Sequence, residues 1–298
     1  MVPPAPPPGL SPVVTEAPVE PSLRSVVQPD SIGAPPPTQK ISIPPELLEA
    51  SLPQSLGLDD LPLFGDIPVE HRAAFFAAAK RKTLGERDFV RGFALGVVLR
   101  GEAQVTGFNS EVVVARLRAG SVLRARGTAG KALAMRLSAR GGGCDVVTWS
   151  EAPLNATFQS CPWVDGELRA ASNQTLGLVG AASGVLGSLE VRTLEKLTEW
   201  LQPRVLGPGE VALHEGEPTP PLLVVGTGTV EIVRGGGAPE RTLGPGELVT
   251  PADCARGARA AVTARAGADG AVVMVVDKAR RQAMEAALPA VIALLTGL

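Results

Sequence analysis

The feature that most constrains the fold is an internal repeat, in which a valine-rich pattern punctuated by glycine occurs twice. Three pairs of segments share a shift of 126 or 127 residues: 97–105 with 224–232, Gly120 with Gly246, and 161–164 with 288–291. A nearly constant shift over such a length indicates a duplication. The chain of 298 residues is therefore predicted to contain one structural unit twice.

Short β-branched runs alternate with glycine in both copies. Residues 97–105, 112–117 and 222–233 predict strands separated by tight turns, because glycine adopts the backbone angles that such turns need. Flanking helices are expected at 66–82, with Asp66 as N-cap and Lys80–Lys82 at the end, and at 150–189, 194–201, 277–284 and 288–295. The predicted fold class is mainly β with flanking helices, because strands at this spacing are typical of sandwiches and barrels.

Small residues interrupt the helical stretch around 168–189, and two interpretations of them stay open. The six are Gly177, Gly180, Ala181, Ala182, Gly184 and Gly187. Glycines weaken an isolated helix, which suits a flexible linker between the two copies. They also permit close packing of this helix against the second copy or against a partner chain.

The first 60 residues differ in composition from the rest of the chain. Half of the prolines, 14 of 28, lie in residues 1–45, where no aromatic residue occurs. Such a segment cannot bury enough apolar surface to offset its ordering entropy, so a disordered Pro-rich tail is predicted over 1–60, with a short helix at 45–52. The tail is a solvated leader or a docking segment for a protein partner, in which Pro35–Pro37 enter an aromatic groove.

Charge and hydropathy exclude several classes of protein. The net charge of −2 gives no global basic field, so neither nucleic acid nor an anionic membrane is an expected partner. No apolar run approaches the roughly 18 residues that span a bilayer. The N-terminal residues also lack the pattern of a secretory signal. Cys144, Cys161 and Cys254 form no Cys-x-x-Cys and are expected to be buried, reduced thiols in a cytoplasmic protein.

The chain has too few histidines for the metal site of a cupin, a class of enzyme with a related β-roll. His71 and His214 are the only two, and a metal-binding cupin needs at least a second histidine beside His214. Neither histidine accompanies a nucleophile in a recognisable elbow. The sequence therefore predicts a protein without catalytic activity, metal or cofactor.

A locally basic stretch occurs in the first copy. It comprises Arg124, Arg126, Lys131, Arg136 and Arg140. The interpretation adopted is a solvated loop or strand face, and binding of an anion or nucleic acid is the alternative. Aromatic residues, 3% of the chain, are too few to supply stacking platforms for nucleic acid.

The second copy resembles the cyclic-nucleotide-binding domain family, the regulatory module of catabolite activator proteins and of cyclic-nucleotide-gated kinases and channels. The resemblance rests on residues 205–218, 223–232, 243–247 and 275–278, and residues 61–68 are similar to the lead-in of that domain. It implies two tandem domains of this type, jelly-roll-like double-stranded β-helices at 61–189 and 190–298, of which the first is degenerate. No helix-turn-helix is expected after either copy.

The resemblance also implies where a ligand would bind. In the family's phosphate-binding cassette a glutamate accepts from the ribose hydroxyl, and an arginine pairs with the cyclic phosphate beside backbone N–H groups. The matching stretch of the second copy is 248–261, and the corresponding stretch of the first copy, 122–131, has no acidic residue. The candidate ligand-binding residues are Thr250, Asp253, Arg259, Ala260 and Ala261.

Within this set, Arg259 stands at the arginine position, directly before Ala260 and Ala261. Thr250 and Pro251 replace the family's Gly-Glu pair, and Asp253 is a candidate substitute for the glutamate. The C-terminal helix, 277–295, would close over the cassette as a lid.

Two functions follow as hypotheses. The first is a regulatory sensor that binds a cyclic nucleotide or another small anion in the second copy. The second is an adaptor whose degenerate rolls and Pro-rich tail dock proteins without a small ligand. The interior of the second roll discriminates between them, because a sensor needs an open polar cavity there and an adaptor does not.

Overall fold

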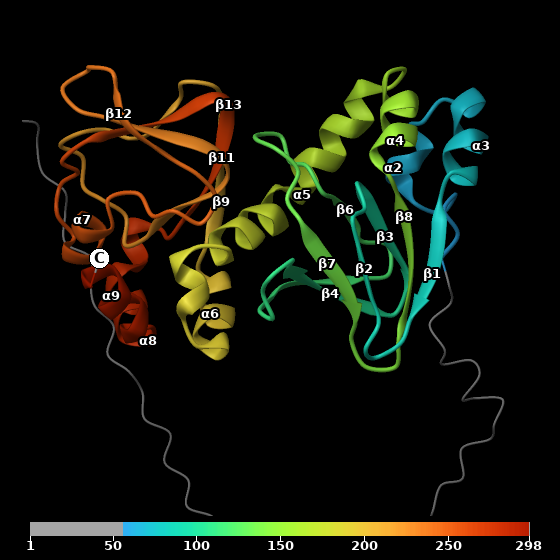
Figure 1. Ribbon diagram of the computed structural model, residues 1–298, viewed down its shortest axis with the longest axis horizontal. Helices are drawn as coiled ribbons and strands as arrows, with labels where there is room; N and C mark the ends of the chain where they lie inside the picture. The colour runs from blue at the N-terminus through green and yellow to red at the C-terminus, as the bar shows by residue number, and fades with distance from the viewer. Residues whose placement is uncertain (1–55, 298) are drawn as a thin grey trace, which may run out of the picture. The chain divides into compact units, whose positions relative to one another are not determined.

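The first β-roll consists of short antiparallel strands between Lys80 and Trp149. The structure is a computed structural model, which describes residues 56–297 (Figure 1). The strands are β1 (Lys80–Leu84), β2 (Phe89–Arg91), β3 (Leu95–Arg100), β4 (Glu102–Gly107), β5 (Val113–Arg118), β6 (Val122–Arg124), β7 (Met135–Ala139) and β8 (Cys144–Trp149). They form two sheets, in the orders β1-β8-β3-β6 and β2-β7-β4-β5. This interleaved order is that of a jelly roll, so the predicted fold class is confirmed.

The second β-roll repeats this plan with longer strands. Its strands are β9 (Gln202–Leu206), β10 (Val211–Leu213), β11 (Leu223–Val233), β12 (Pro239–Leu243) and β13 (Thr263–Val275). Strand β11 pairs with β13 from Leu223 opposite Val275 to Val233 opposite Thr263, and the register shifts around Gly226 and around Thr229. In the first copy Gly101 divides the equivalent segment into two strands, β3 and β4. In the second copy the same segment is one continuous strand, β11. The 127-residue shift therefore corresponds to equivalent strands.

Helices flank both rolls, in the order that the sequence predicts. They are α2 (Pro62–Gly65), α3 (Val69–Ala77), α4 (Glu151–Phe158), α5 (Pro162–Ala182), η1 (Val185–Ser188), α6 (Val191–Thr198), α7 (Pro251–Arg256), η2 (Lys278–Arg280), α8 (Arg281–Ala287) and α9 (Pro289–Thr296). Among these described helices, none is both long enough and apolar enough to cross a membrane.

Both predicted ends of the first helix are wrong. Asp66 closes α2 and does not cap α3, which begins after Pro68. Lys80–Lys82 do not end this helix, because they lie in β1 and pair with Val146–Thr148 of β8. A long-range sheet partner therefore outweighs the favourable interaction of cations with a helix C-terminus.

The predicted tail overlaps the packed part of the chain by a few residues. The Leu56 N–H donates to the Leu99 carbonyl oxygen (3.0 Å), and Leu58 is buried. The helix expected at 45–52 and the disorder expected in the tail lie outside the described residues. The described residues, 56–297, belong to one compact unit, and the division at residue 189 between the predicted domains stays a prediction.

Glycines in α5 permit close packing against the second roll, which confirms one of the two interpretations of its small residues. A Cβ atom on Gly180 would overlap the carbonyl oxygen of Gly226 in β11. A Cβ on Gly184, just after α5, would overlap the carbonyl oxygen of Gly246 in the same way. Because backbone meets backbone at both points, only glycine fits.

Candidate functional site

The cassette of the second roll is built around the short helix α7. Thr250 precedes this helix with a left-handed backbone (φ 45°), a conformation rare for a β-branched residue. Gly257 ends the helix, also with a positive φ of 64°. The chain then returns through Arg259, which forms an isolated β-bridge with Pro218, into β13.

The polar side chains of this cassette are engaged with the protein itself. The Ala261 N–H donates to a carboxylate oxygen of Asp253 (3.4 Å), and the Ala260 N–H donates to the Glu217 carbonyl (2.8 Å). The exposed Arg259 guanidinium donates to the carbonyl oxygen of Gly216 (2.7 Å). Of the five candidate residues, the structure thus brings Asp253 to Ala261 and directs Arg259 to a neighbouring loop.

The C-terminal helices already contact this cassette. From α8, the Arg281 guanidinium donates to the carbonyl oxygens of Cys254 in α7 (2.6 Å) and of Thr219 (3.0 Å). Leu288 and Val291, around the start of α9, are buried. The C-terminal helices therefore pack against the cassette, and their action as a lid stays a prediction.

The interior of the second roll is filled with apolar side chains. Its buried members are Leu206, Leu213, Leu223, Val225, Val230, Leu243, Val249, Cys254, Ala260, Ala264, Ala266, Ala271 and Val273. Burial raises the pKa of the Cys254 thiol to about 11, and the thiol donates to the Val249 carbonyl (3.4 Å). All three cysteines are buried and free, which confirms the predicted burial.

The corresponding loop of the first roll contacts the second roll. The Thr227 hydroxyl of β11 donates to the Ala129 carbonyl oxygen (3.1 Å), and the Gly130 N–H donates to that of Asp269 (3.4 Å). Asn173 of α5 accepts from the Thr128 N–H (3.0 Å). The Thr128 and Gly130 N–H groups, which could otherwise donate to an anion, are thus engaged within the protein, and no sequence motif pointed to these contacts.

The predicted solvated basic face is wrong for its first member, Arg124, which is fully buried. Its guanidinium donates twice to Glu151 (2.9 Å each), once to Asp165 (3.0 Å) and once to the Ala94 carbonyl (2.9 Å). Arg136 of β7 forms an ion pair with Glu111, and Arg140 forms one with Glu102 of β4, both at 3.0 Å. Arg126, Lys131 and Arg140 are exposed, as predicted, so the prediction of a solvated face fails for Arg124 and not for the whole stretch.

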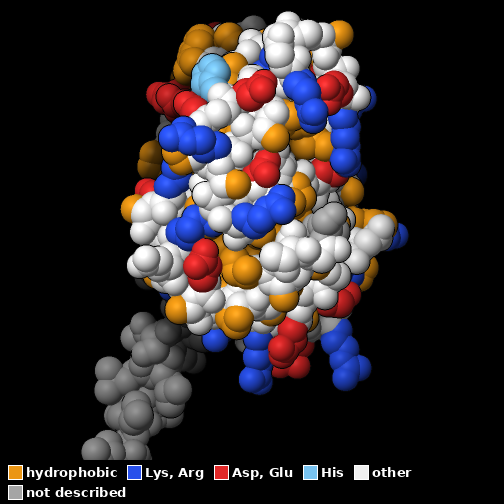
Figure 2. All heavy atoms as spheres, turned by 90° about the vertical axis from the view of Figure 1, so that its left-hand side faces the viewer, with side chains coloured by type: hydrophobic (Ala, Val, Ile, Leu, Met, Phe, Trp, Pro, Cys, Tyr) orange, Lys and Arg blue, Asp and Glu red, His pale blue; other side chains and the backbone are white. Residues whose placement is uncertain are grey.

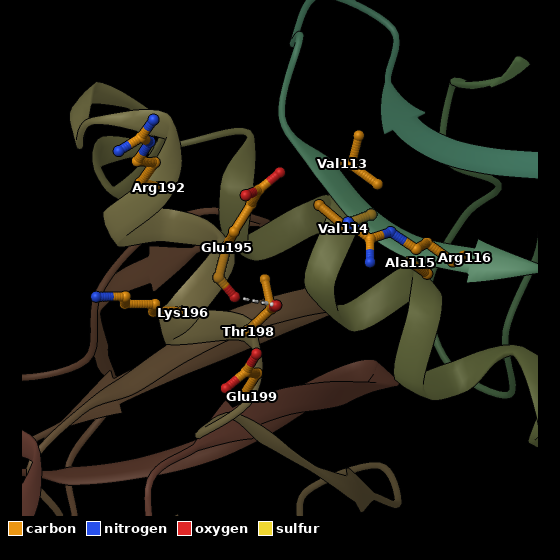
Figure 3. A pocket seen from close by; sticks show the side chains of 9 residues that line it. All are labelled: Val113, Val114, Ala115, Arg116, Arg192, Glu195, Lys196, Thr198 and Glu199. Carbon is orange, nitrogen blue, oxygen red and sulfur yellow. Dashed lines mark hydrogen bonds between the residues drawn. The ribbon is translucent and has the colours of Figure 1, made fainter. Parts of the chain in front are cut away.

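A hollow of about 430 Å³ lies between β5 and α6 (Figure 3). Its lining residues are Val113, Val114, Ala115, Arg116, Arg192, Glu195, Lys196, Thr198 and Glu199. Figure 3 shows Arg192 and Lys196 pointing away from Arg116, so the three cations do not converge on one point. With acidic and basic side chains intermixed, the hollow selects neither an anion nor a cation. The face of the second roll in Figure 2 is similarly mixed in charge.

An exposed cluster of aromatic and arginine side chains lies on the β2-β7-β4-β5 sheet of the first roll. Phe89 of β2 and Phe108, at the end of β4, are 42% and 43% exposed. The Arg91 guanidinium lies over both rings, 5.9 Å from the Phe89 centroid and 5.5 Å from the Phe108 centroid. Arg136 lies 5.8 Å from the Phe89 centroid on the same face. Sequence reasoning missed this cluster, because its members come from segments up to 47 residues apart.

Comparison with known proteins gives likenesses in structure alone. No protein-family model matches the chain, and no curated protein matches its sequence. The chain is similar to the regulatory domain of Toxoplasma gondii PKA with cAMP, at 15% identity and a TM-score of 0.36, over 79% of this chain and 90% of that one. It is also similar to the regulatory subunit of a cAMP-independent protein kinase A from Trypanosoma cruzi bound to guanosine. The identity is 17% and the TM-score 0.34, over 78% of this chain and 81% of that one.

A third similar structure is a cyclic nucleotide-binding domain from Methylobacillus flagellatus, at 16% identity and a TM-score of 0.34. The match covers 40% of this chain and 71% of that one.

Proposed function

We propose that the protein is a regulatory adaptor, whose two β-rolls act through contacts with proteins and not by binding a cyclic nucleotide. The observation that carries this proposal is the filled interior of the second roll. Ligand pockets for small molecules typically have volumes of about 300 Å³ or more. A nucleotide could enter this interior only by displacing buried groups such as Leu223, Val249 and Cys254, at the cost of their burial.

The polar groups of the cassette support the same proposal. A phosphate bound at Ala261 would have to displace the Asp253 carboxylate, and the two anions would repel each other. Arg259 would also have to leave the Gly216 carbonyl oxygen, which accepts from it at 2.7 Å. An adaptor needs neither change.

Thermal unfolding of the full chain with cAMP, cGMP or cyclic di-GMP, each at about 1 mM, is expected to leave the Tm unchanged. A ligand present at 100 times its Kd would stabilise the folded state by about 2.7 kcal/mol, which is a shift of several degrees for a unit of this size. The matched variants are Arg259→Ala and Arg234→Ala, since both arginines are exposed. A rise in Tm that only Arg259→Ala abolishes would contradict the adaptor proposal and support a sensor.

A second candidate function is binding of a small anion at the cassette, because the Ala261 N–H there donates to a negatively charged group, the Asp253 carboxylate. On this hypothesis Asp253→Ala frees the donor, so sulfate raises the Tm of this variant more than that of the unchanged chain. Asp269→Ala is the control, since that exposed residue uses only its backbone in the contact with Gly130. Equal responses of all three chains to sulfate would exclude the candidate.

A further inference from the structure

Strand β1 forms an open edge of the first roll. It lies at the end of the β1-β8-β3-β6 sheet and pairs with β8 alone, from Lys80 opposite Thr148 to Leu84 opposite Cys144 (Figure 1). In an antiparallel pair, alternate residues of an edge strand direct their N–H and C=O groups away from the partner strand. Within residues 56–297, these outward groups of β1 form no backbone hydrogen bond. The edge therefore presents a row of unpaired donors and acceptors.

The side chains of β1 carry charge of one sign. Lys80, Arg81 and Lys82 are consecutive and exposed, and because side chains alternate along a strand, cations stand on both of its faces. The Lys82 ammonium donates to the Phe89 carbonyl oxygen (3.1 Å). None of the three cations has an acidic partner in the described part of the chain.

Two edge strands of the second roll are protected in ways that β1 lacks. Strands β9 and β12, like β1, expose four successive residues before a buried leucine. Each contains a proline, Pro203 or Pro239, which removes one donor from the edge. Arg204 of β9 donates to two carbonyl oxygens of β10, and Arg241 of β12 pairs with Glu247. An open cationic edge thus distinguishes β1 from both of these strands.

A hollow beside β1 leaves room for a side chain of an added strand. Its volume is about 240 Å³, and it is lined by Arg81, Lys82, Leu99, Asp145 and Val147 among others. The carboxylate of Asp145 is already engaged, since it accepts from the Thr83 hydroxyl (2.7 Å) and pairs with Arg100 (2.9 Å). The hollow therefore combines apolar walls with two cations of β1 that this carboxylate does not neutralise.

An extended acidic segment of another protein matches both the backbone and the charge of this edge. When a strand is added to a sheet, main-chain hydrogen bonds provide affinity and side chains provide specificity. Carboxylates at alternate positions of the added strand would lie beside Lys80 and Lys82, since residues two apart share a face. A second copy does not match, because two antiparallel β1 strands in full register would place Lys82 opposite Lys82. A nucleic acid would meet the cations but has no peptide backbone to continue the ladder.

We propose that the β1 edge binds an extended acidic segment of a protein partner, which continues the sheet as a strand beside β1. The inference rests on the proposed adaptor function, because it names the kind of segment that such an adaptor contacts. Both the charge and the unpaired backbone of β1 are needed for this binding, so each is tested by its own probe.

Fluorescence anisotropy of the full chain with labelled peptides tests the charge. The probe is Thr-Glu-Val-Glu-Val-Glu-Val-Thr, in which the glutamates share one face of an extended strand. At a salt concentration of about 0.1 M, this acidic probe is expected to bind about tenfold more tightly than the same peptide with lysine at each glutamate position. Equal affinities of the two peptides would overturn the inference.

A methylated form of the acidic probe tests the backbone. Methyl groups on the amide nitrogens of its glutamates and valines keep its charge but remove donors from both of its edges. This form is expected to bind about tenfold more weakly, because strand addition needs those donors. Amide hydrogen exchange of Lys80–Leu84 is expected to slow with the unmethylated probe only. Equal binding of both forms would show attraction between charges alone and would contradict strand addition.

Threonine variants locate the site, since threonine favours strands. Lys80→Thr combined with Arg81→Thr is expected to weaken binding of the acidic probe about fivefold. The matched control is Arg116→Thr with Arg118→Thr in β5, another edge strand, where both arginines are exposed and form no ion pair within residues 56–297. The control is expected to bind the acidic probe as the unchanged chain does. If both double variants lost the same affinity, the β1 edge would not be the site.

The other outcomes separate this inference from the adaptor proposal. A labelled oligothymidylate that binds more tightly than the acidic probe, and loses affinity in the β1 variant, would make the partner a nucleic acid and overturn the inference. If the acidic probe does not bind while cyclic nucleotides leave the Tm unchanged, the inference fails and the adaptor proposal stands. A cyclic nucleotide that raises the Tm through Arg259 would instead overturn the adaptor proposal itself.

Discussion

Replacing Gly180 with alanine is expected to lower the free energy of unfolding by about 3 kcal/mol, within the usual range for overpacking. The same change at Gly166 of the same helix is expected to raise it by about 0.5–1 kcal/mol, because alanine favours a helix more than glycine does. The new Cβ at position 180 would overlap the Gly226 carbonyl oxygen, whereas at position 166 nothing lies within 4 Å. Two backbones must separate in the first case, and no rotamer change can relieve the overlap.

Urea unfolding of the two variants and the unchanged chain measures this difference. The comparison is sharp because both substitutions add one methyl group to α5, so helix propensity alone predicts the same sign for both. If Gly180→Ala were as stable as Gly166→Ala, α5 would not pack on β11 at this point. With the expected result, α5 is a structural member of both rolls, and the two rolls should unfold in one transition.

The sequence predicted those features that depend on local pattern. The repeat follows from comparing segments 126 or 127 residues apart, whereas the alternation of valine with glycine and the order of the flanking helices follow from spacing within short windows. Each of these appears in the structure. The glycines of α5 show what such short windows leave undecided. Their spacing permitted either a linker or close packing, and the partner that decides between them, Gly226, is 46 residues from Gly180.

The sequence likewise predicted the position of the candidate site but not its long-range contacts. The Arg259-Ala260-Ala261 sequence located the cassette, and the structure places α7 and the following turn there. The sequence could not reveal that Arg259 is bonded to Gly216, 43 residues earlier, or that Asp253 accepts from Ala261. Whether a cassette is open or closed on itself depends on tertiary contacts, which residue types alone do not encode.

The prediction for Arg124 was wrong, because this buried group was interpreted as part of a solvated face. Its partners Glu151 and Asp165 lie 27 and 41 residues away in sequence, beyond any local charge pattern. Both belong to helices that follow β8, so the pairing forms only when α4 and α5 pack on the end of β6. The buried guanidinium therefore links the helical layer to the sheet.

The pairing makes the stability of the protein depend on pH in acid. The hydrogen bond from Arg124 lowers the pKa of Glu151 below its ordinary value of 4.5. A carboxylate whose pKa is lowered on folding contributes stability that is complete above the unfolded pKa and is lost as the pH falls through the folded one. The contribution is reduced by solvent, since the Glu151 side chain is 47% exposed.

Arg124→Ala is expected to lower the free energy of unfolding by about 3–5 kcal/mol at pH 7, the usual cost of removing one partner from a buried ion pair. The variant leaves the Ala94 carbonyl without its donor and Asp165 with Arg169 alone, and it opens a cavity where the side chain was. Arg126→Ala is the matched control, two residues along, where the side chain is exposed; its effect is expected to stay within about 0.5 kcal/mol.

Urea unfolding between pH 7 and pH 3 adds a readout that a cavity alone would not change. The difference in stability between the unchanged chain and Arg124→Ala should narrow below pH 4.5, because only the unchanged chain loses the Arg124–Glu151 interaction on protonation. Arg124→Lys should recover part of the loss, since lysine restores the charge but not the planar pair of donors that Glu151 accepts. A difference that is constant with pH would show that Arg124 stabilises the fold by filling space and not by its charge.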